Sequence, residues 1–344
     1  MRNAGIDVVV RCYRHGRFLR ECVDSILSQS IGDIRVLVID NASTDNSLEV
    51  ASQLAAEDSR IEVVAHPRNV GATASYNEGI DWASAEYFVL LDADDLLAPG
   101  CLARALACME AHREVSFTYG IEAFRLSDGT MQVLPEHSEE APWRLAAGRE
   151  LIAQICRFPT NHVGAPTVVR RTSMQKRIGY YRPSLPYTDD LEMWLRLASV
   201  GDVGSISTVQ GVRRIHSLQM SEDYRSNMVR DFTEREAAFV SFFSNEGRFV
   251  PGADAMLKLA VRRLGEHAYW SAVSHLFRGH AGDAAQLLRF CLNRRPSAAL
   301  IPPVGWLLRM DRPLHRVVQI GRETLGRLKA AARRPGAARG TASR

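Results

Sequence analysis

Three carboxylates stand close together at the end of an apolar run. Asp92, Asp94 and Asp95 directly follow the run Tyr87–Leu91. Like charges at this spacing are unfavourable unless a positive group lies among them. Mg2+ would fit, because it takes one or two protein carboxylates and completes its octahedron with phosphate oxygens and water. The alternative is a solvated acidic turn, in which Asp95 caps a helix expected around residues 102–109.

Other polar groups follow apolar runs elsewhere in the chain. A turn of short polar side chains occupies Asp40–Asp45, and the sequence R-N-V-G at Arg68–Gly71 leads into a predicted helix. Asp189 and Asp190 precede an amphipathic run. A carboxylate there can act as a general base, and the alternative is plain capping of the helix.

His216 follows the apolar run at residues 212–215, beside Arg213 and Arg214, which are placed to neutralise phosphate. A lone histidine in such a position is most often structural. Trp143 and His162, in the irregular middle of the chain, are candidates for an acceptor pocket. The remaining histidines form no spacing that suggests a metal site: His15, His66, His112, His137, His267, His275, His280 and His315.

The elements that must position these side chains alternate between strand and helix patterns. Buried strands are expected at 6–10, 34–40, 61–65 and 87–91, and helices at 16–29, 47–57 and 73–83. Such repeated units predict a parallel sheet with helices on both faces. Ligands of open parallel sheets bind beyond the carboxyl ends of the strands, which here are the residues after Val10, Asp40, Ala65 and Leu91.

The rest of the chain is less regular and then becomes helical. Strands are expected at 115–119, 121–125, 168–170 and 212–215, with a helix from about Asp190. Helices follow at 232–243, 255–277 and 283–292, and the last two form a hairpin around residues 279–283. We therefore expect three parts: a ligand-binding half at 1–115, a catalytic half at 116–230, and a helical extension at 231–344.

Composition excludes several classes of protein. The chain has 344 residues, of which 46% are hydrophobic, so it is not disordered as a whole. No apolar run approaches the roughly 20 residues of a membrane span, and no secretory signal is recognised. We expect a cytoplasmic protein. The six cysteines form no C-x-x-C pair and are expected to be buried reduced thiols: Cys12, Cys22, Cys101, Cys108, Cys156 and Cys291.

The net charge of +4 is concentrated near the end of the chain. From Arg309 to Arg344 there are ten Lys or Arg residues against Asp311 and Glu323, after an apolar stretch at Leu300–Met310. A solvated terminus is the simplest interpretation, and contact with an anionic membrane surface is the alternative. Nucleic-acid binding is not expected.

The four polar motifs, in this order along the chain, resemble those of the family 2 glycosyltransferases, over about Ile6 to Ser221. The resemblance implies the GT-A fold, a nucleotide-diphospho-sugar donor, an inverting reaction and a divalent metal, Mg2+ or Mn2+. It also implies a glycan or lipid-linked glycan as acceptor, and a location in the cytoplasm, peripheral at the inner membrane face.

The resemblance assigns the donor contacts by position. The family motif that lies against the nucleobase stands here as R-C-Y-R and keeps only its tyrosine, so Cys12 and Tyr13 take that place. Asp40 and Asn41 match a D-D-G-S or D-N-G-S turn. Asn41 in place of an aspartate weakens the case for UDP and leaves dTDP and GDP open. Arg68 and Asn69 fall near the base and phosphates.

The resemblance also assigns the reacting groups. Asp92 would face the ribose, Asp94 would hold the metal that bridges the diphosphate, and His216 would assist it. Asp190, the second acid of the pair, would be the general base, with Trp194 and Arg196 at the family spacing. It would remove the acceptor proton while the anomeric carbon gains oxocarbenium character.

Two other functions compete with this one. The degenerate R-C-Y-R motif would also suit a catalytically idle nucleotide-binding or scaffold protein. A nucleotidyltransferase also joins a parallel sheet to metal-holding acids, but it would carry a Gly-rich, Lys-bearing loop after the first strand. Residues 11–17 contain one glycine and no lysine.

Overall fold

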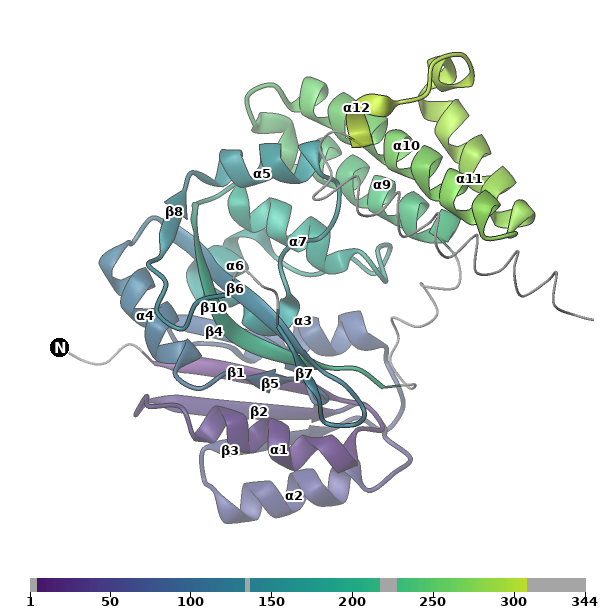
Figure 1. Cartoon of the computed structure of the whole chain (residues 1–344). Helices are drawn as coiled ribbons and strands as arrows, with labels where there is room; N and C mark the ends of the chain where they lie inside the picture. The colour runs from purple at the N-terminus through teal and green to yellow at the C-terminus, as the bar shows by residue number, and fades with distance from the viewer. Residues whose placement is uncertain (1–4, 134–136, 217–227, 308–344) are drawn as a thin grey trace, which may run out of the picture. The chain divides into compact units, whose positions relative to one another are not determined.

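The computed structural model describes residues 5–133, 137–216 and 228–307 (Figure 1). Its first strands are β1 (Ile6–Cys12), β2 (Ile34–Asp40), β3 (Ile61–Ala65) and β4 (Tyr87–Asp92). They lie in the order β3-β2-β1-β4, and each adjacent pair is parallel. The predicted parallel sheet is confirmed, and the carboxyl ends of the four strands meet at one edge.

Helices cover both faces of this sheet, as expected. They are α1 (Gly16–Leu27), α2 (Ser47–Glu57), α3 (Ala72–Trp82) and α4 (Cys101–Ala111). Val8 and Val10 share a core with α1, α2 and α4. Val9 points to the other face, where α3 packs so closely that a Cβ at Gly79 would lie 2.6 Å from Val9 Cγ1. This alternation of side chains is what a strand covered on both faces requires.

The second half of the sheet has mixed directions. Strand β9 (Val169–Arg171) is antiparallel to both β4 and β6 (Val115–Arg125), while β10 (Asp202–Arg214) is parallel to β6. Short strands complete the sheet: β5 (Leu96–Leu97), β7 (Met131–Gln132) and β8 (Arg144–Ala146). The long path runs β3-β2-β1-β4-β9-β6-β10-β5.

Two strand predictions in this half were wrong in extent. The strands expected at 115–119 and 121–125 are the single strand β6, and the strand expected at 212–215 is the end of β10. Gly120, within β6, permits close approach to β10, since a Cβ there would lie 2.8 Å from the carbonyl oxygen of Thr208.

Helices of the middle region pack on β6, β9 and β10. They are α5 (Gly148–Arg157), η1 (Ala165–Thr167), α6 (Thr172–Ile178) and α7 (Asp189–Ala198). The ring of Trp194 on α7 stacks on Phe117 of β6, with centroids 5.7 Å apart. This contact packs α7 on β6, and residues 191–198 of the helix are all buried.

The helices expected at the end of the chain are confirmed. They are α9 (Met228–Ser244), η2 (Glu246–Phe249), α10 (Ala253–Phe277), α11 (Ala281–Arg294), η3 (Pro296–Ala299) and α12 (Val304–Leu307). Gly279, at φ 82°, makes the left-handed turn between α10 and α11.

The chain forms two compact units. The first comprises residues 1–223 and 234–260, and the second comprises residues 224–233 and 261–344. The second unit has its own aromatic core, in which Phe232 contacts His267 and Phe290, and His267 stacks on Trp306. The division into parts at residues 115 and 230 stays a prediction.

Other expectations concern the whole chain. All six cysteines are free and buried, as predicted. Within the described ranges, none of the helices has the length and apolar character that a membrane crossing requires. The basic segment at 309–344 and the end of the apolar stretch before it lie outside the described residues.

Candidate active site

Asp92 is held by two donors on one of its oxygens. Arg11 Nε donates to Asp92 Oδ1 at 2.7 Å, and the Tyr76 hydroxyl donates to the same oxygen at 2.8 Å. The Arg11 guanidinium also lies 4.9 Å from the centre of the Tyr76 ring. These contacts orient the carboxylate, and Arg11 partly offsets its charge.

Asp94 lies between two histidines. His216 Nε2 is 3.0 Å from Asp94 Oδ2, and His15 Nδ1 is 3.5 Å from Asp94 Oδ1. Burial alone would raise the pKa of Asp94, but the hydrogen bond from His216 and the nearby His15 outweigh it and hold the pKa below its ordinary value. Burial lowers the pKa of His15, which favours the neutral imidazole.

The ligand atoms of His15, Asp94 and His216 all lie within 4.8 Å of one another. One carboxylate oxygen and two imidazole nitrogens form a donor set that suits divalent first-row metals. The residues present therefore fit the cation that the sequence implies. His15 was not predicted here, although it comes only two positions after Tyr13 and just beyond the end of β1.

Asp95 is buried beside these groups and is 7% exposed. Burial raises its pKa well above the ordinary value, and the negative charges of Asp94 and Asp92 add to this effect. Arg213 opposes it. Asp95 does not cap a helix, because α4 begins at Cys101 with Gly100 as its N-cap. Capping therefore does not explain this acidic turn.

Asp190 lies in the first turn of α7, whose N-cap is Thr188. Its backbone N–H donates to Asp189 Oδ1 at 3.0 Å, and Asn161 Nδ2 lies 3.5 Å from Asp190 Oδ2. Burial raises the pKa of Asp190, and the charge of Asp92 raises it further, while Arg213 lowers it. The charge of Asp92, at the end of β4, therefore contributes to the pKa of Asp190, although the two residues are far apart in the sequence. A carboxyl group with a raised pKa is a stronger base when ionised.

Arg213 and Arg214, which were predicted to neutralise phosphate, are each paired with a glutamate. Arg213 Nη2 is 3.0 Å from Glu122 Oε1, and Arg214 Nη2 is 2.5 Å from Glu21 Oε2. The side chain of Arg214 is only 6% exposed and its guanidinium lies over the Phe18 ring. Both charges are balanced by glutamates of neighbouring elements, which sequence spacing does not reveal.

Two residues were predicted to contact the nucleobase. Cys12 is the last residue of β1, and Tyr13 follows it. Tyr13 is 36% exposed, whereas Cys12 is fully buried in the hydrophobic core. The Cys12 carbonyl accepts from the Asn41 N–H at 2.9 Å, and a donor contact at Cys12 stays a prediction. Arg14 has φ 59°, and its backbone N–H donates to Ser43 Oγ at 2.9 Å. This bond ties the segment after β1 to the turn after β2.

The turn after β2 contains Asp40 and Asn41, both 2% exposed. Asp40 Oδ2 accepts from the Ser43 N–H at 3.1 Å, while Oδ1 is buried without a partner among the described residues. Asn41 Nδ2 donates to Asn69 Oδ1 at 3.0 Å, and its own oxygen accepts from the Val70 N–H at 2.9 Å. These two hydrogen bonds of Asn41 hold the R-N-V-G segment against the turn after β2.

Three more residues of this region follow β3. Arg68 and Asn69 were predicted as donor contacts, whereas His66 was not. Arg68 and Asn69 are exposed. His66 bridges elements, with Nδ1 at 3.0 Å from Asn41 Oδ1 and Nε2 at 2.6 Å from Glu78 Oε2. The structure thus brings the predicted Asp40, Asn41 and Asn69 to one edge of the sheet.

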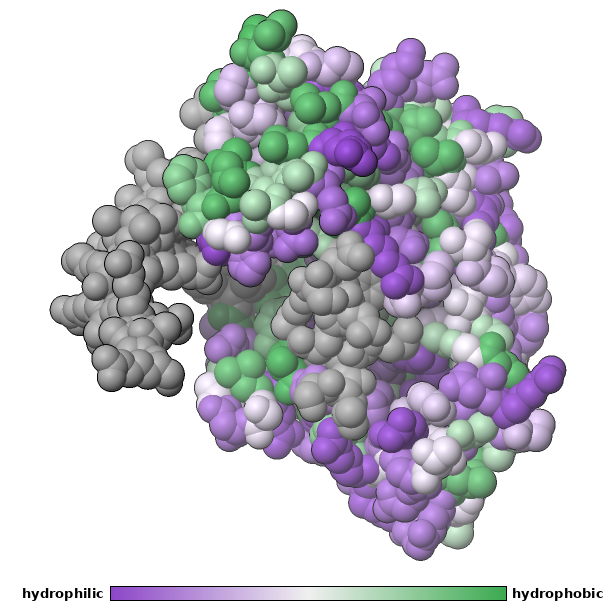
Figure 2. Space-filling view, turned by 90° about the vertical axis from the view of Figure 1, so that its right-hand side faces the viewer, coloured by the Kyte–Doolittle hydropathy of each residue, from purple (hydrophilic) through white to green (hydrophobic). Residues whose placement is uncertain are grey.

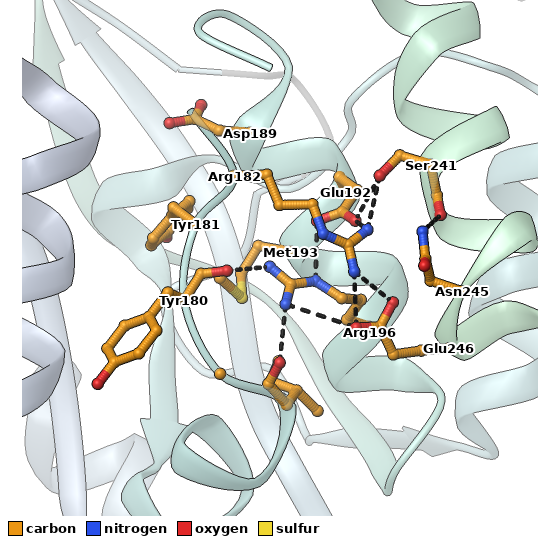
Figure 3. Close-up of polar contacts among 12 residues, drawn as sticks. Tyr180, Tyr181, Arg182, Asp189, Glu192, Met193, Arg196, Ser241, Asn245 and Glu246 are labelled. Carbon is orange, nitrogen blue, oxygen red and sulfur yellow. Dashed lines mark hydrogen bonds and ion pairs between the residues drawn. The ribbon is translucent and has the colours of Figure 1, made fainter. Parts of the chain in front are cut away.

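A buried ion-pair network anchors α7, the helix that begins at Asp189 (Figure 3). Glu192 accepts from Arg196 Nε at 2.8 Å and is also bonded to Arg182 and Ser241. Arg182 Nη2 donates in turn to both oxygens of Glu246, at 2.7 and 2.8 Å. Arg196 is 2% exposed and donates to two backbone carbonyls, those of Ile178 and Tyr180. Arg196, which the sequence analysis named for its spacing from Asp190, is thus a member of this network.

The acceptor-pocket candidates have different surroundings. Trp143 is partly buried against the hydrophobic core. His162 is exposed, and its Nε2 is 2.7 Å from Thr160 Oγ1. It adjoins Asn161, whose amide reaches Asp190, so of the two candidates only His162 has a neighbour that contacts the predicted base.

Comparisons with known proteins agree with this architecture. Residues 7–177 match the family model described as glycosyl transferase family 2. The putative glycosyltransferase EpsE of Bacillus subtilis is 30% identical over 209 residues, which are 57% of this chain and 67% of EpsE. The glycosyltransferase GlyG of Streptococcus pneumoniae is 38% identical over 92 residues, and the match spans only 31% of its length.

Two solved structures share the fold. Residues 1–349 of Staphylococcus aureus TarS, in complex with UDP-GlcNAc, superpose with a TM-score of 0.54 at 17% identity, covering 86% of this chain and 91% of that one. The mannosyltransferase PcManGT from Pyrobaculum calidifontis, in complex with GDP-Man and Mn2+, gives 0.54 at 17% identity, covering 97% and 88%. With the parallel sheet, its added mixed half and the helices that follow, the chain has the GT-A fold and belongs to glycosyl transferase family 2.

Proposed function

We propose that the protein transfers a sugar, with inversion, from a nucleoside diphosphate sugar to an acceptor hydroxyl. The observation that carries this proposal is the contact of Tyr76 with both sides: its hydroxyl donates to Asp92 Oδ1 at 2.8 Å, and its ring lies 5.3 Å from that of Tyr181, in the segment that leads to Asp190. Inverting transfer needs a base on the side of the sugar opposite the leaving group. Asp190, partly buried and with a raised pKa, suits that role, while the acidic turn suits the leaving-group side.

We assign the leaving-group side to Asp94 and His216, with Asp92 directed to the ribose. A divalent cation, Mg2+ or Mn2+, held at Asp94 would stabilise the charge that develops on the departing diphosphate. His216 and Asp94 already lie 3.0 Å apart, so a cation there requires little rearrangement of the protein. Arg11 supports this division of roles, because it offsets the charge of Asp92 and leaves Asp94 to the cation.

We assign the donor nucleotide to the strand ends that carry Asp40, Asn41, Arg68 and Asn69, together with Tyr13. The buried Asp40 Oδ1, which has no partner among the described residues, supports a ligand at this edge. The solved relatives contain different nucleotides, UDP-GlcNAc in TarS and GDP-Man in PcManGT, and the Mn2+ of PcManGT supports a metal in this chain.

A thermal-shift screen tests the donor assignment. UDP-, GDP- and dTDP-sugars are each added to the full chain with Mn2+, with Mg2+ or with EDTA. A true donor must raise Tm, since it binds the native form only. We expect a shift for one nucleotide class that EDTA abolishes, followed by release of the nucleoside diphosphate when acceptor is supplied. Binding without any release of nucleotide would favour the idle nucleotide-binding alternative.

The acceptor we propose is a glycan or a lipid-linked glycan at the cytoplasmic face of a membrane. Leu300, Ile301 and Val304 are 87%, 67% and 58% exposed, and the basic segment follows them in the sequence. Apolar surface also gathers over the C-terminal helices in the upper part of Figure 2. Adjacent apolar and basic groups suit an anionic bilayer surface.

Co-sedimentation with vesicles tests this membrane contact. The full chain should sediment with phosphatidylglycerol vesicles and not with phosphatidylcholine vesicles. A variant with Leu300→Ser and Ile301→Ser should bind less, because apolar burial adds to electrostatic attraction. Equal binding of both proteins to both vesicles would remove the proposal.

A further inference from the structure

His15 joins Asp94 and His216 in a cluster that the sequence did not connect. The three ligand atoms lie within 4.8 Å of one another, and among the described residues this is the one such group of three found. The carboxylate lies between the two rings, with one oxygen 3.0 Å from His216 Nε2 and the other 3.5 Å from His15 Nδ1. All three side chains are largely shielded from solvent, at 8–15% exposure.

Each of these two separations, taken by itself, is one that two atoms bound to the same ion can have, and each histidine faces a different oxygen of Asp94. Ligand atoms about 2.1 Å from a common metal lie about 3.0 Å apart when adjacent in an octahedron, and about 3.4 Å apart in a tetrahedron. A distance of 3.5 Å between His15 and Asp94 is long for a direct hydrogen bond. The His15 nitrogen is therefore placed better for a shared cation than for Asp94 itself.

The position of His15 is fixed by its backbone and by its ring. Its N–H donates to Ser47 Oγ at 3.2 Å, and its carbonyl accepts from the Phe18 N–H at the start of α1. The His15 and His216 rings meet edge to face at 5.5 Å, and Phe18 contacts both. Such support restricts the orientation of a ligand before the metal arrives.

We propose that His15 is a third protein ligand of the cation and makes the site select Mn2+ over Mg2+. The proposal rests on the function proposed above and deepens it. Mg2+ prefers oxygen ligands and keeps its waters, so a site with two imidazoles and one carboxylate suits it poorly. Mn2+ also favours oxygen ligands, but as a first-row transition-metal ion it accepts imidazole nitrogen more readily than Mg2+ does.

The test measures binding of the metal alone to the full chain. Electron paramagnetic resonance of free Mn2+ gives its affinity, and competition gives that of Mg2+. We expect His15→Ala to weaken Mn2+ binding at least about tenfold, the smallest loss typical for groups supporting a metal site. Mg2+ binding should change by less than about threefold. His112→Ala, on an exposed histidine, is the matched control and should change neither.

The outcomes separate this proposal from the function on which it rests. If His15→Ala binds Mn2+ like the wild type while Asp94→Ala does not, His15 is no ligand and the metal site stands without it. If Asp94→Ala also binds Mn2+ like the wild type, the proposed metal site itself fails. Equal losses of Mn2+ and Mg2+ in His15→Ala would overturn the selectivity.

A second measurement does not depend on a variant that folds. Electron spin-echo modulation of the wild-type Mn2+ complex detects coordinated imidazole nitrogens directly. Two such nitrogens support the proposal, and a single one overturns it. Thermal unfolding of His15→Ala and His112→Ala, recorded in EDTA, shows whether the apo variants remain folded.

Discussion

Asn77 and Tyr181 exchange two hydrogen bonds across the first unit. Asn77 Nδ2 donates to the Tyr181 carbonyl at 3.0 Å, and the Tyr181 N–H donates to Asn77 Oδ1 at 2.8 Å. Asn77 belongs to α3, beside the strand ends proposed to hold the donor, and Tyr181 lies in the segment that leads to α7 and Asp190. The adjacent Tyr76 ring lies 5.3 Å from the Tyr181 ring and bonds Asp92. These contacts connect the two sides of the proposed reaction.

Asn77→Ala should therefore lower transfer more than it lowers donor binding. Loss of both hydrogen bonds leaves backbone groups of Tyr181 without their partner, at a cost of about 1–3 kcal/mol. We expect a reduced kcat, a nearly unchanged Kd for the donor and a modestly lower Tm. Ser52→Ala, on the exposed face of α2, is the control. A loss confined to donor affinity would contradict this account.

Asp190→Asn should abolish transfer and spare donor binding. The amide cannot accept the acceptor proton, and general-base catalysis contributes at least about a hundredfold to rate. Nucleotide release measures the reaction, and calorimetry measures donor affinity. Asp128→Asn, in the exposed turn before β7, serves as control. Activity retained by Asp190→Asn would assign the base to another residue.

Asp94→Ala should remove the metal-dependent part of donor affinity. The metal bridge to a diphosphate is worth several kcal/mol, so we expect affinity in Mn2+ to fall at least about tenfold, toward the value in EDTA. Calorimetry with and without EDTA measures both. Glu110→Ala, exposed on α4, should behave like the wild type. Unchanged affinity of Asp94→Ala in Mn2+ would place the cation elsewhere.

The pH profile should report the raised pKa of Asp190. The base acts when ionised, so kcat/KM should fall as pH drops through that pKa, which burial places above the ordinary aspartate value of about 3.9. Arg213 lowers the pKa of Asp190, so Arg213→Gln should move this acidic limb to higher pH. Arg157→Gln, exposed on α5, should not move it. A shift to lower pH would have the wrong sign for this electrostatic account.

Glu192→Gln should destabilise the protein strongly. Glu192 and Arg196 are 1% and 2% exposed, and removing one partner of such a buried pair costs about 3–5 kcal/mol. Denaturant unfolding and Tm measure the loss. Glu57→Gln breaks the exposed pair with Arg20 and should leave Tm unchanged. Similar losses in the two variants would mean that burial of the network contributes little.

The sequence by itself determined the strands and helices that build the site. Strands β1 to β4 and the helices between them were predicted within a few residues, because side-chain periodicity is a local property of the chain. The rule that ligands bind at the carboxyl ends of parallel strands then brought Asp40, Asn69 and Asp94 to one edge of the sheet. The motifs also indicated the family.

Only the tertiary structure decided which distant side chains meet. Nothing in the spacing of His15 linked it to Asp94, and nothing near Arg11 named Asp92 as its partner. The continuity of β6 through Gly120 was likewise missed. Such contacts depend on strand register and on how helices pack against the sheet, which residue periodicity does not encode.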